Sequence, residues 1–295
     1  MAESTTSRPC LTPGLHPNVA EKVYREDPGL NASVVKHGVG EGSSIAAMNW
    51  ARANPKEPTA SMELGTALHS LVLEPETFLE RHPVYRESKT KGEGAKTKWA
   101  AFQKANEGKV ILDPEDETKL ALMRESIMDH PYARLLVTGK GERECVAIWN
   151  SDTGLRCKAR IDFLNAERRV LVDLKTTCDA SERAWARSAA DFKYDVQAAW
   201  YQWGFGKVTG QSCTMAFVVV ENSGMHRCRV FTLPPEAINA AGRAIRDLLP
   251  HWREAERTKT YPDIPHNDPT EIEWPAWATR TPGVVEIASE ADIPF

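Results

Sequence analysis

The chain has 295 residues, of which 41% are hydrophobic, and its formal net charge is −4 at pH 7. No apolar run approaches the roughly 18 residues that span a bilayer, so the composition predicts a globular protein of one large or two small domains rather than a membrane protein. The first ten residues lack the basic and apolar regions of a signal peptide, so we expect a cytoplasmic location.

Acidic charge is concentrated at the C-terminal end. Residues 263–295 contain seven acidic residues and one basic residue, which leaves the rest of the chain at +2. A nearly neutral body can still bind DNA through a local cationic groove. The six cysteines form no C-x-x-C pair, so neither a disulfide framework nor a zinc site is predicted.

The first part of the chain is expected to form helices separated by turns. Residues 1–13 are rich in Ser, Thr and Pro and are expected to be disordered. We expect no catalytic chemistry from residues 16–38. A lysine-rich stretch, residues 87–98, predicts a mobile loop whose Lys96 and Lys98 can follow a phosphate backbone. The predicted helices begin near Val34, cover residues 45–53 and 61–73, and begin again at Pro114 after an Asp113 cap.

Two strands joined by a polar turn occupy residues 155–177. Successive side chains of a strand point to opposite sides, so cations and a carboxylate share one side of the first strand. In the second strand, Asp173 and Lys175 project together from apolar surroundings, where each buried ion costs several kcal/mol unless it is compensated. The charged series of the first strand is Arg156, Lys158, Arg160 and Asp162.

A divalent metal is one compensation for these charges. Asp162 and Asp173 on adjacent strands can converge on Mg²⁺, a hard cation that takes oxygen ligands. Lys175 would then orient the attacking water or stabilise charge on a phosphoryl oxygen. The alternative is a structural hairpin with an ordinary Asp–Lys ion pair, because D-x-K is short and common.

The remaining elements suggest an α/β fold. Helices are predicted over residues 181–188 and 195–205, and the second places Gln197 and Tyr201 on one face. Central strands between flanking helices indicate a mixed sheet covered by helices, in one domain over residues 14–280. The other predicted elements are strands 142–150, 214–221 and 228–232 and an amphipathic helix over residues 234–259.

Several motifs together resemble the PD-(D/E)XK nucleases, and within that superfamily the RecE-type exodeoxyribonuclease VIII branch. The likeness covers nearly the whole chain and implies a restriction-endonuclease-like fold. The motifs are Asp162 with Asp173-Leu174-Lys175, the flanking GLRCKARIDFL, VLVDLKTT and YDVQAAWY, and, elsewhere, PGLHP, LGTALHSLVLEPETF and EWPAW.

The resemblance implies a metal centre. His69 of GTALH becomes a ligand beside Asp162, Asp173 and the Leu174 carbonyl, although a lone helical histidine is most often structural. Glu144 is either an acidic residue near the metal or a surface glutamate. The expected cofactor is Mg²⁺, for which Mn²⁺ can substitute, and the cysteine spacing predicts no iron–sulfur cluster.

The resemblance also implies contacts with DNA and a reaction. Gln197 and Tyr201 match a helical motif that contacts substrate near the site, and Arg156, Lys158 and Arg160 would bind phosphates. The implied enzyme enters at duplex ends, degrades the 5′-ended strand and leaves a 3′ overhang for phage recombination, as a tetrameric ring. Two alternatives remain open: a repair or defence endonuclease on the same fold, and a catalytically silent DNA-binding module.

The sequence ends in Asp292-Ile293-Pro294-Phe295, which resembles the acidic C-terminal tip of bacterial single-stranded DNA-binding protein. An aromatic side chain presented together with the α-carboxylate suits a pocket with an apolar floor and a basic rim. We expect this tip, carried on a flexible tail over residues 281–295, to bind the annealing protein that coats the overhang. The alternative is a solvated acidic end.

Overall fold

The structure is a computed structural model that describes residues 10–264 and residue 273 of the chain. The chain divides into two units, Met1–Asp263 and Ile264–Phe295. Every helix and strand formed by the described residues belongs to the first unit. The domain boundary expected at residue 280 and the C-terminal tip lie outside the described residues.

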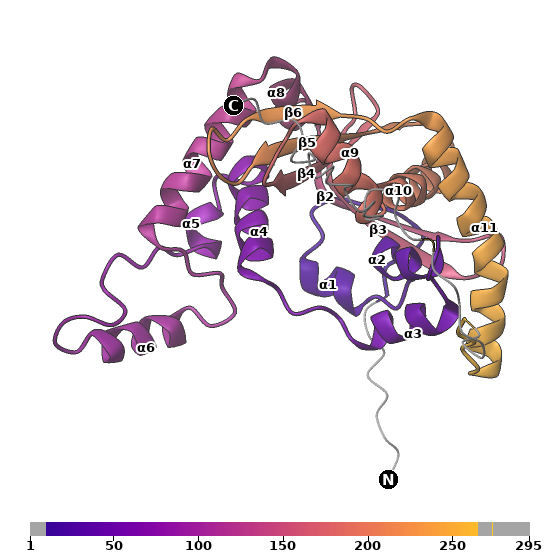
Figure 1. Ribbon diagram of the computed structural model, residues 1–295, viewed down its shortest axis with the longest axis horizontal. Coiled ribbons are helices and arrows are strands. Elements are labelled where there is room, and N and C mark those ends of the chain that lie inside the picture. Colours follow the sequence, from indigo (N-terminus) through magenta and orange to yellow (C-terminus); the bar gives the residue numbers. More distant parts are fainter. Residues whose placement is uncertain (1–9, 265–272, 274–295) are drawn as a thin grey trace, which may run out of the picture. The chain divides into compact units, whose positions relative to one another are not determined.

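A six-stranded sheet forms the centre of the first unit (Figure 1). Its spatial order follows the chain, β1-β2-β3-β4-β5-β6. Strands β4 and β5 are parallel, and the other neighbours are antiparallel. The strands are β1 (Gly14–His16), β2 (Gly141–Asn150), β3 (Arg156–Asn165), β4 (Val170–Thr177), β5 (Thr214–Glu221) and β6 (Cys228–Phe231).

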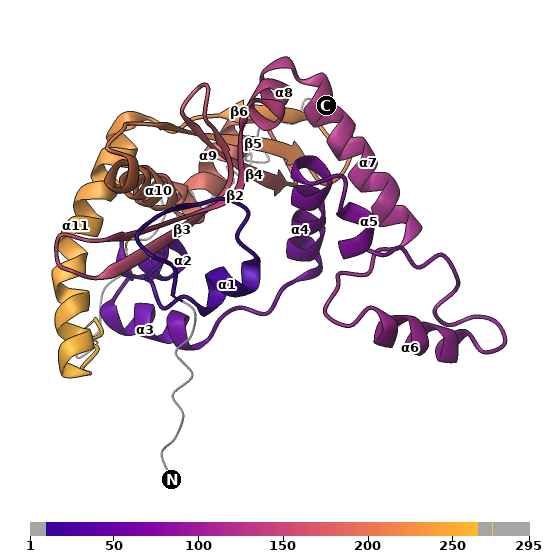
Figure 2. The same cartoon turned by 180° about the vertical axis from the view of Figure 1, so that it is seen from behind.

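Helices pack on both faces of this sheet (Figures 1 and 2). One face packs against α2, α3, α9, α10 and α11, and the other against α4, α7 and α8. Because a parallel pair needs a crossover connection, the chain between β4 and β5 forms α9 and α10. The helices are α1 (Glu21–Glu26), α2 (Ala32–Val35), η1 (Lys36–Gly38), α3 (Ile45–Ala53), α4 (Ala60–Leu73), α5 (Phe78–Arg81), α6 (Ala95–Ala105), α7 (Pro114–Asp129), α8 (Pro131–Thr138), α9 (Glu182–Asp191), α10 (Tyr194–Thr209) and α11 (Pro235–Thr258).

The predicted α/β class and several predicted boundaries are confirmed. Helix α3 and strand β5 have the expected limits, and α4 begins one residue earlier than expected. The Asn31 side chain caps α2 by accepting from the Val34 amide at 3.0 Å. The Asp113 carboxylate accepts from the Glu115 and Asp116 amides at the start of α7.

The lysine-rich stretch differs from the prediction. It is not a loop throughout, because α6 begins at Ala95, so Lys96 and Lys98 lie on a helix. Tyr85 packs against Trp99 and Phe102, with ring centroids 4.9 and 5.0 Å apart, and this aromatic contact supports the helix. The aromatic residues that define α6 follow the lysine run, so the run alone did not reveal it. Figures 1 and 2 show α6 set apart from the sheet.

Within the part of the chain that the structure describes, no helix is both long and apolar enough to cross a bilayer.

Candidate active site

Strand β4 presents an acidic and a basic side chain on the same face. Asp173 and Lys175 lie opposite Phe217 and Val219 of β5, as the predicted alternation requires. Asp173 is buried, and the Lys175 ammonium contacts its Oδ2 atom. Burial disfavours the charged ammonium, but Asp173 and Asp162 outweigh it and raise the pKa of Lys175. The site therefore holds a protonated lysine against a buried carboxylate.

Helix α10 fixes the other oxygen of Asp173. The Gln197 side chain donates from Nε2 to Asp173 Oδ1 at 2.5 Å. Tyr201 lies one turn further along α10, and burial raises its pKa well above the ordinary value. The predicted Gln197 and Tyr201 face is thus directed at the D-x-K strand, and their contact with substrate stays a prediction.

His69, Asp162 and the backbone of Leu174 form a connected group. The Leu174 amide donates to Asp162 Oδ2 at 2.9 Å. The His69 ring approaches the same segment from α4, with Nε2 2.7 Å from the Leu174 carbonyl oxygen and Nδ1 3.4 Å from Asp162 Oδ2. Because a carbonyl only accepts, the proton of this hydrogen bond lies on Nε2. Residues 105 positions apart therefore meet at one point, as the motif resemblance implied.

Glu144 lies beside this group. Its backbone has a φ of 45°, in the left-handed region, and its carboxylate is 2.6 Å from Arg160 Nε. Burial first, and then the charge of Asp162, raises the pKa of Glu144 to about 7. Of the two alternatives, the structure therefore supports the acidic residue near the site rather than the surface glutamate.

Two predicted phosphate-binding residues are instead engaged within the protein. Lys158 is only 4% exposed, and its ammonium donates to the Tyr24 and Asp27 carbonyl oxygens. The Arg156 guanidinium forms an ion pair with buried Asp27. The alternation placed these residues on the correct side of β3, but the segment around α1 covers that side. Arg160 is partly exposed and remains a candidate.

Lys36 is a further residue at the site that its local sequence does not reveal. We expected no chemistry from residues 16–38, yet the Lys36 ammonium lies 3.5 Å from Gln197 Oε1 and 5.0 Å from the centroid of the Tyr194 ring. Burial first, and then the charge of Lys175, lowers the pKa of Lys36 to about 8. No local signal marks this lysine, because its partners lie about 160 positions away along the chain.

The family comparison supports the interpretation of this geometry. Residues 40–266 match the family described as the PDDEXK-like domain of unknown function (DUF3799). The chain belongs to this family. The match supports the PD-(D/E)XK superfamily predicted from the sequence, and it does not distinguish the RecE-type branch. No curated protein sequence matches the chain.

Solved structures share the fold of this PDDEXK-like protein. A proposed exonuclease from Eubacterium rectale has a TM-score of 0.57 and 14% identity, and the match covers 84% of this chain and 91% of that one. A phage-related exonuclease from Haemophilus somnus 129PT has a TM-score of 0.33 and 11% identity, with coverage of 78% and 96%. The first likeness, with the mixed sheet and its flanking helices, shows the restriction-endonuclease-like fold and nothing beyond it.

The donor set of the PDDEXK-like site suits a hard divalent cation. His69 lies against Asp162 and the Leu174 carbonyl, and the charge of Asp162 acts on nearby Asp173, whose buried Oδ2 atom contacts the Lys175 ammonium. Among the described residues, no three His, Cys, Asp or Glu side chains already surround one point. The residues His69, Asp162, Asp173 and Leu174 therefore fit a metal in chemistry, with Asp173 turned toward Lys175.

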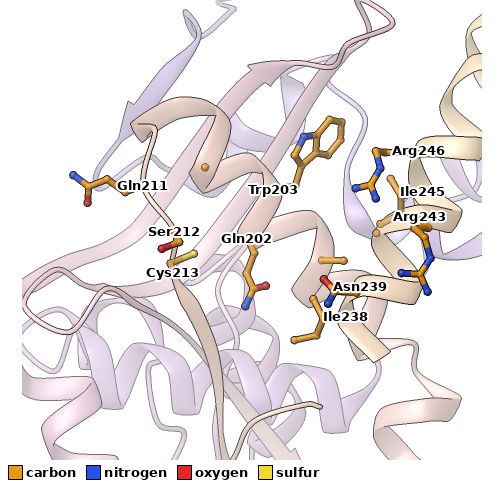
Figure 3. A pocket seen from close by; sticks show the side chains of 13 residues that line it. Gln202, Trp203, Gln211, Ser212, Cys213, Ile238, Asn239, Arg243, Ile245 and Arg246 are labelled. Atoms are coloured by element: carbon orange, nitrogen blue, oxygen red, sulfur yellow. The ribbon is translucent and has the colours of Figure 1, made fainter. Parts of the chain in front are cut away.

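A separate cavity of about 430 Å³ lies between α10 and α11. Figure 3 shows Gln202 and Trp203 of α10 across from Asn239, Arg243 and Arg246 of α11. None of the site residues described above lines this cavity, so it is not part of the carboxylate and lysine cluster.

Proposed function

We propose that this PDDEXK-like protein is a Mg²⁺-dependent exonuclease that degrades double-stranded DNA from its ends. The observation that carries the proposal is buried Asp173 in contact with Lys175, beside Asp162. A hairpin held only by packing gains nothing from burying this pair, because desolvation offsets the attraction. Two nearby carboxylates can instead bind a divalent metal, and a lysine beside them can neutralise charge on a phosphoryl oxygen during phosphodiester hydrolysis.

The residues of the chain have distinct parts in this reaction. A divalent metal held by Asp162, Asp173, His69 and the Leu174 carbonyl would supply an activated water and polarise the phosphoryl oxygen. Lys175 neutralises charge that develops on the phosphoryl oxygens. Asp162 and His69 bind the amide and carbonyl of Leu174 respectively, which fixes the orientation of this carbonyl.

The finer assignment rests on the motif resemblance to RecE-type enzymes. In this proposal the enzyme removes nucleotides from the 5′-ended strand and leaves a 3′ overhang for single-strand annealing recombination. It acts as a homo-oligomeric ring around duplex DNA. Its C-terminal residues, Asp292 to Phe295, bind the annealing protein that coats the overhang. The likeness of this tip to that of single-stranded DNA-binding protein supports the last point.

Digestion of end-labelled DNA tests the proposed reaction. Linear duplex carries separate labels at its 5′ and 3′ ends, and a covalently closed circle of the same sequence is the control. We expect Mg²⁺-dependent release of the 5′ label as a mononucleotide, while the circle stays intact. We also expect the tetramer to release mononucleotides from linear DNA faster than smaller assemblies do. Cleavage of the circle would indicate an endonuclease instead. Binding of DNA without any cleavage in Mg²⁺ or Mn²⁺ would indicate the silent module.

A further inference from the structure

Phe192 is an exposed aromatic residue at the corner between α9 and α10. Its side chain is 61% exposed, whereas other rings of this region are largely covered. The Phe192 ring stacks on the ring of Tyr194, with centroids 5.9 Å apart and an interplanar angle of 29°. One face of the Phe192 ring therefore packs on Tyr194, and the rest of the ring is accessible to a ligand.

The corner that carries Phe192 is held in place. Its amide donates to the Ser188 carbonyl at 2.9 Å. The next residue, Lys193, has a φ of 53°, a left-handed conformation that is unfavourable for a residue other than glycine. Three acceptors on the segment after α2 fix the Lys193 ammonium: the Lys36 and Val39 carbonyl oxygens and the Ser43 hydroxyl. The backbone that carries the exposed ring is thus held in one conformation.

The Tyr194 ring links Phe192 to the catalytic lysine. The Lys175 ammonium lies 5.2 Å from the Tyr194 centroid, and the Lys36 ammonium lies 5.0 Å from it. On its buried side, Tyr194 stacks against Trp185 and Phe217, with centroids 5.4 and 5.5 Å apart. Phe192 is therefore the outer member of a row of rings anchored in the core, one ring away from Lys175.

Lys36 provides a cation close to the same ring. The hydrogen bond from its ammonium to Gln197 is long, at 3.5 Å, and the ammonium also lies against the face of the Tyr194 ring. An ammonium has three N–H donors, so these contacts leave donors for an anionic acceptor. A nucleotide combines a flat aromatic base with an anionic phosphate, and so matches an exposed ring and an ammonium that both lie against Tyr194.

We propose that the α9–α10 corner is a nucleotide subsite, in which Phe192 stacks on a base of the substrate strand and Lys36 binds a phosphate of that strand. Stacking on a ring tolerates any base, as a nuclease without sequence preference requires. The subsite rests on the proposed nuclease function, because it positions the strand beside Asp173 and Lys175. A protein partner that covers Phe192 is the competing occupant, and the experiments below separate the two.

Fluorescence of a base analogue tests the stacking without catalysis. Oligonucleotides carrying 2-aminopurine near the end are titrated with the full-length protein in EDTA. We expect quenching by the wild type and by Phe192→Trp. Phe192→Ala should lose the quenching and bind about tenfold more weakly, which is the effect of losing one base–aromatic stack. Tyr132→Ala is the matched control, because Tyr132 is a 47% exposed aromatic residue on α8.

The salt dependence of the same binding separates the phosphate contact from the stack. For single-stranded DNA, each neutralised phosphate contributes about 0.7 to the slope of log K against log salt. Lys36→Gln should reduce the slope by about this amount, and Phe192→Ala should leave it unchanged. Lys22→Gln is the control, because Lys22 has an 85% exposed side chain on α1.

Cleavage of DNA with a single abasic residue completes the test. In the wild type, an abasic nucleotide at the position in the DNA that contacts Phe192 should raise KM about tenfold. In Phe192→Ala, the same abasic nucleotide should have no further effect on KM. Wild-type quenching without any cleavage would contradict the nuclease but leave the subsite standing. Cleavage with equal quenching and equal KM in the wild type and Phe192→Ala would overturn the subsite and leave Phe192 for a protein partner.

Discussion

Asp173 is the residue on which the site depends most, because two different elements hold its two oxygens. Lys175 of the same strand contacts Oδ2, and Gln197 of α10 donates to Oδ1. A carboxylate fixed from both sides has one orientation, which a ligand of a metal requires. In the proposed reaction, Gln197 is therefore a positioning residue that acts through Asp173.

Replacing Gln197 by Leu should lower kcat about 10-fold to 100-fold with a smaller change in KM, because Asp173 loses its donor and its fixed orientation. Steady-state cleavage of linear duplex measures both constants. Gln202→Leu removes a glutamine of the same helix that lines the separate cavity between α10 and α11, and this variant should behave as the wild type. Equal loss in both variants would show damage to α10 rather than to Asp173.

Glu221 couples stability to acid pH. This buried carboxylate at the end of β5 accepts from Arg227 and from the Ala180 and Arg227 amides, and these hydrogen bonds outweigh desolvation and lower its pKa to about 2 from 4.5. Its stabilising contribution is therefore complete above the unfolded pKa and is lost as pH falls from about 4.5 toward 2.

Glu221→Gln should destabilise the protein by about 1–2 kcal/mol at pH 7, a range reduced because solvent screens the exposed Arg227. Urea unfolding at pH 7 and pH 3.5 measures the free energy of unfolding at each pH. This free energy should differ less between the two pH values in the variant than in the wild type. Glu254→Gln removes an exposed partner of Arg257 and should not measurably change the free energy of unfolding at either pH. An unchanged pH dependence in Glu221→Gln would contradict the assignment.

At the scale of elements, α10 packs against β2 through a glycine. A Cβ atom at Gly204 would lie 2.6 Å from the Trp149 ring, whereas one at Gly206 would meet nothing closer than 3.7 Å. The Trp149 ring is buried between α10 and the sheet, with Trp200 and Trp203 around it. Two glycines about half a turn apart in the same helix therefore differ in the space around them: Gly204 has no room for a methyl group, and Gly206 has room for one.

Gly204→Ala should destabilise the fold by about 1–3 kcal/mol, because the methyl group overpacks against an indole that cannot move freely. Gly206→Ala should instead stabilise it by about 0.5–1 kcal/mol, since alanine favours the helix and fits the space. Thermal unfolding followed by circular dichroism measures both. Stabilisation by both substitutions would mean that Trp149 can move away from α10.

Local periodicity predicted most of these elements, and its failures have a physical pattern. The alternation around Asp173 and Lys175 fixed their common face, and cap residues such as Asn31 and Asp113 marked helix starts. Helix α6 was missed because its defining aromatic residues follow a lysine run. Strand β1 was missed because three residues carry too little pattern, and pairing with β2 creates it.

At the scale of the whole molecule, the site joins segments that are far apart in the sequence. His69 meets Leu174, and Lys36 meets Gln197, only because the sheet and α10 bring them together. The motif resemblance predicted His69, whereas Lys36 and Phe192 belong to none of the motifs that carry the resemblance. The same long-range packing covers Arg156 and Lys158, whose charge alone suggested a surface for DNA.

Removal of Ile293 to Phe295 tests the proposed tail contact at this scale. Cleavage of linear duplex should be unchanged, because the proposed catalytic residues lie in the unit Met1–Asp263. Co-purification with the annealing protein should be lost, and a free peptide of the same sequence should compete with the full-length protein. Equal binding by the truncated and complete chains would reduce the tail to a solvated acidic end.

The central claim is that Asp173 and Lys175 form a metal-dependent nuclease centre. The most direct measurement is Mg²⁺-dependent release of nucleotides from linear duplex by Asp173→Asn and Lys175→Gln, with Asp247→Asn on the exposed face of α11 as control and thermal unfolding as a check on folding. We predict at least a hundredfold loss in the first two variants and full activity in the control. Full activity in a folded Asp173→Asn protein, or none in the wild type with Mg²⁺ or Mn²⁺, would contradict the account.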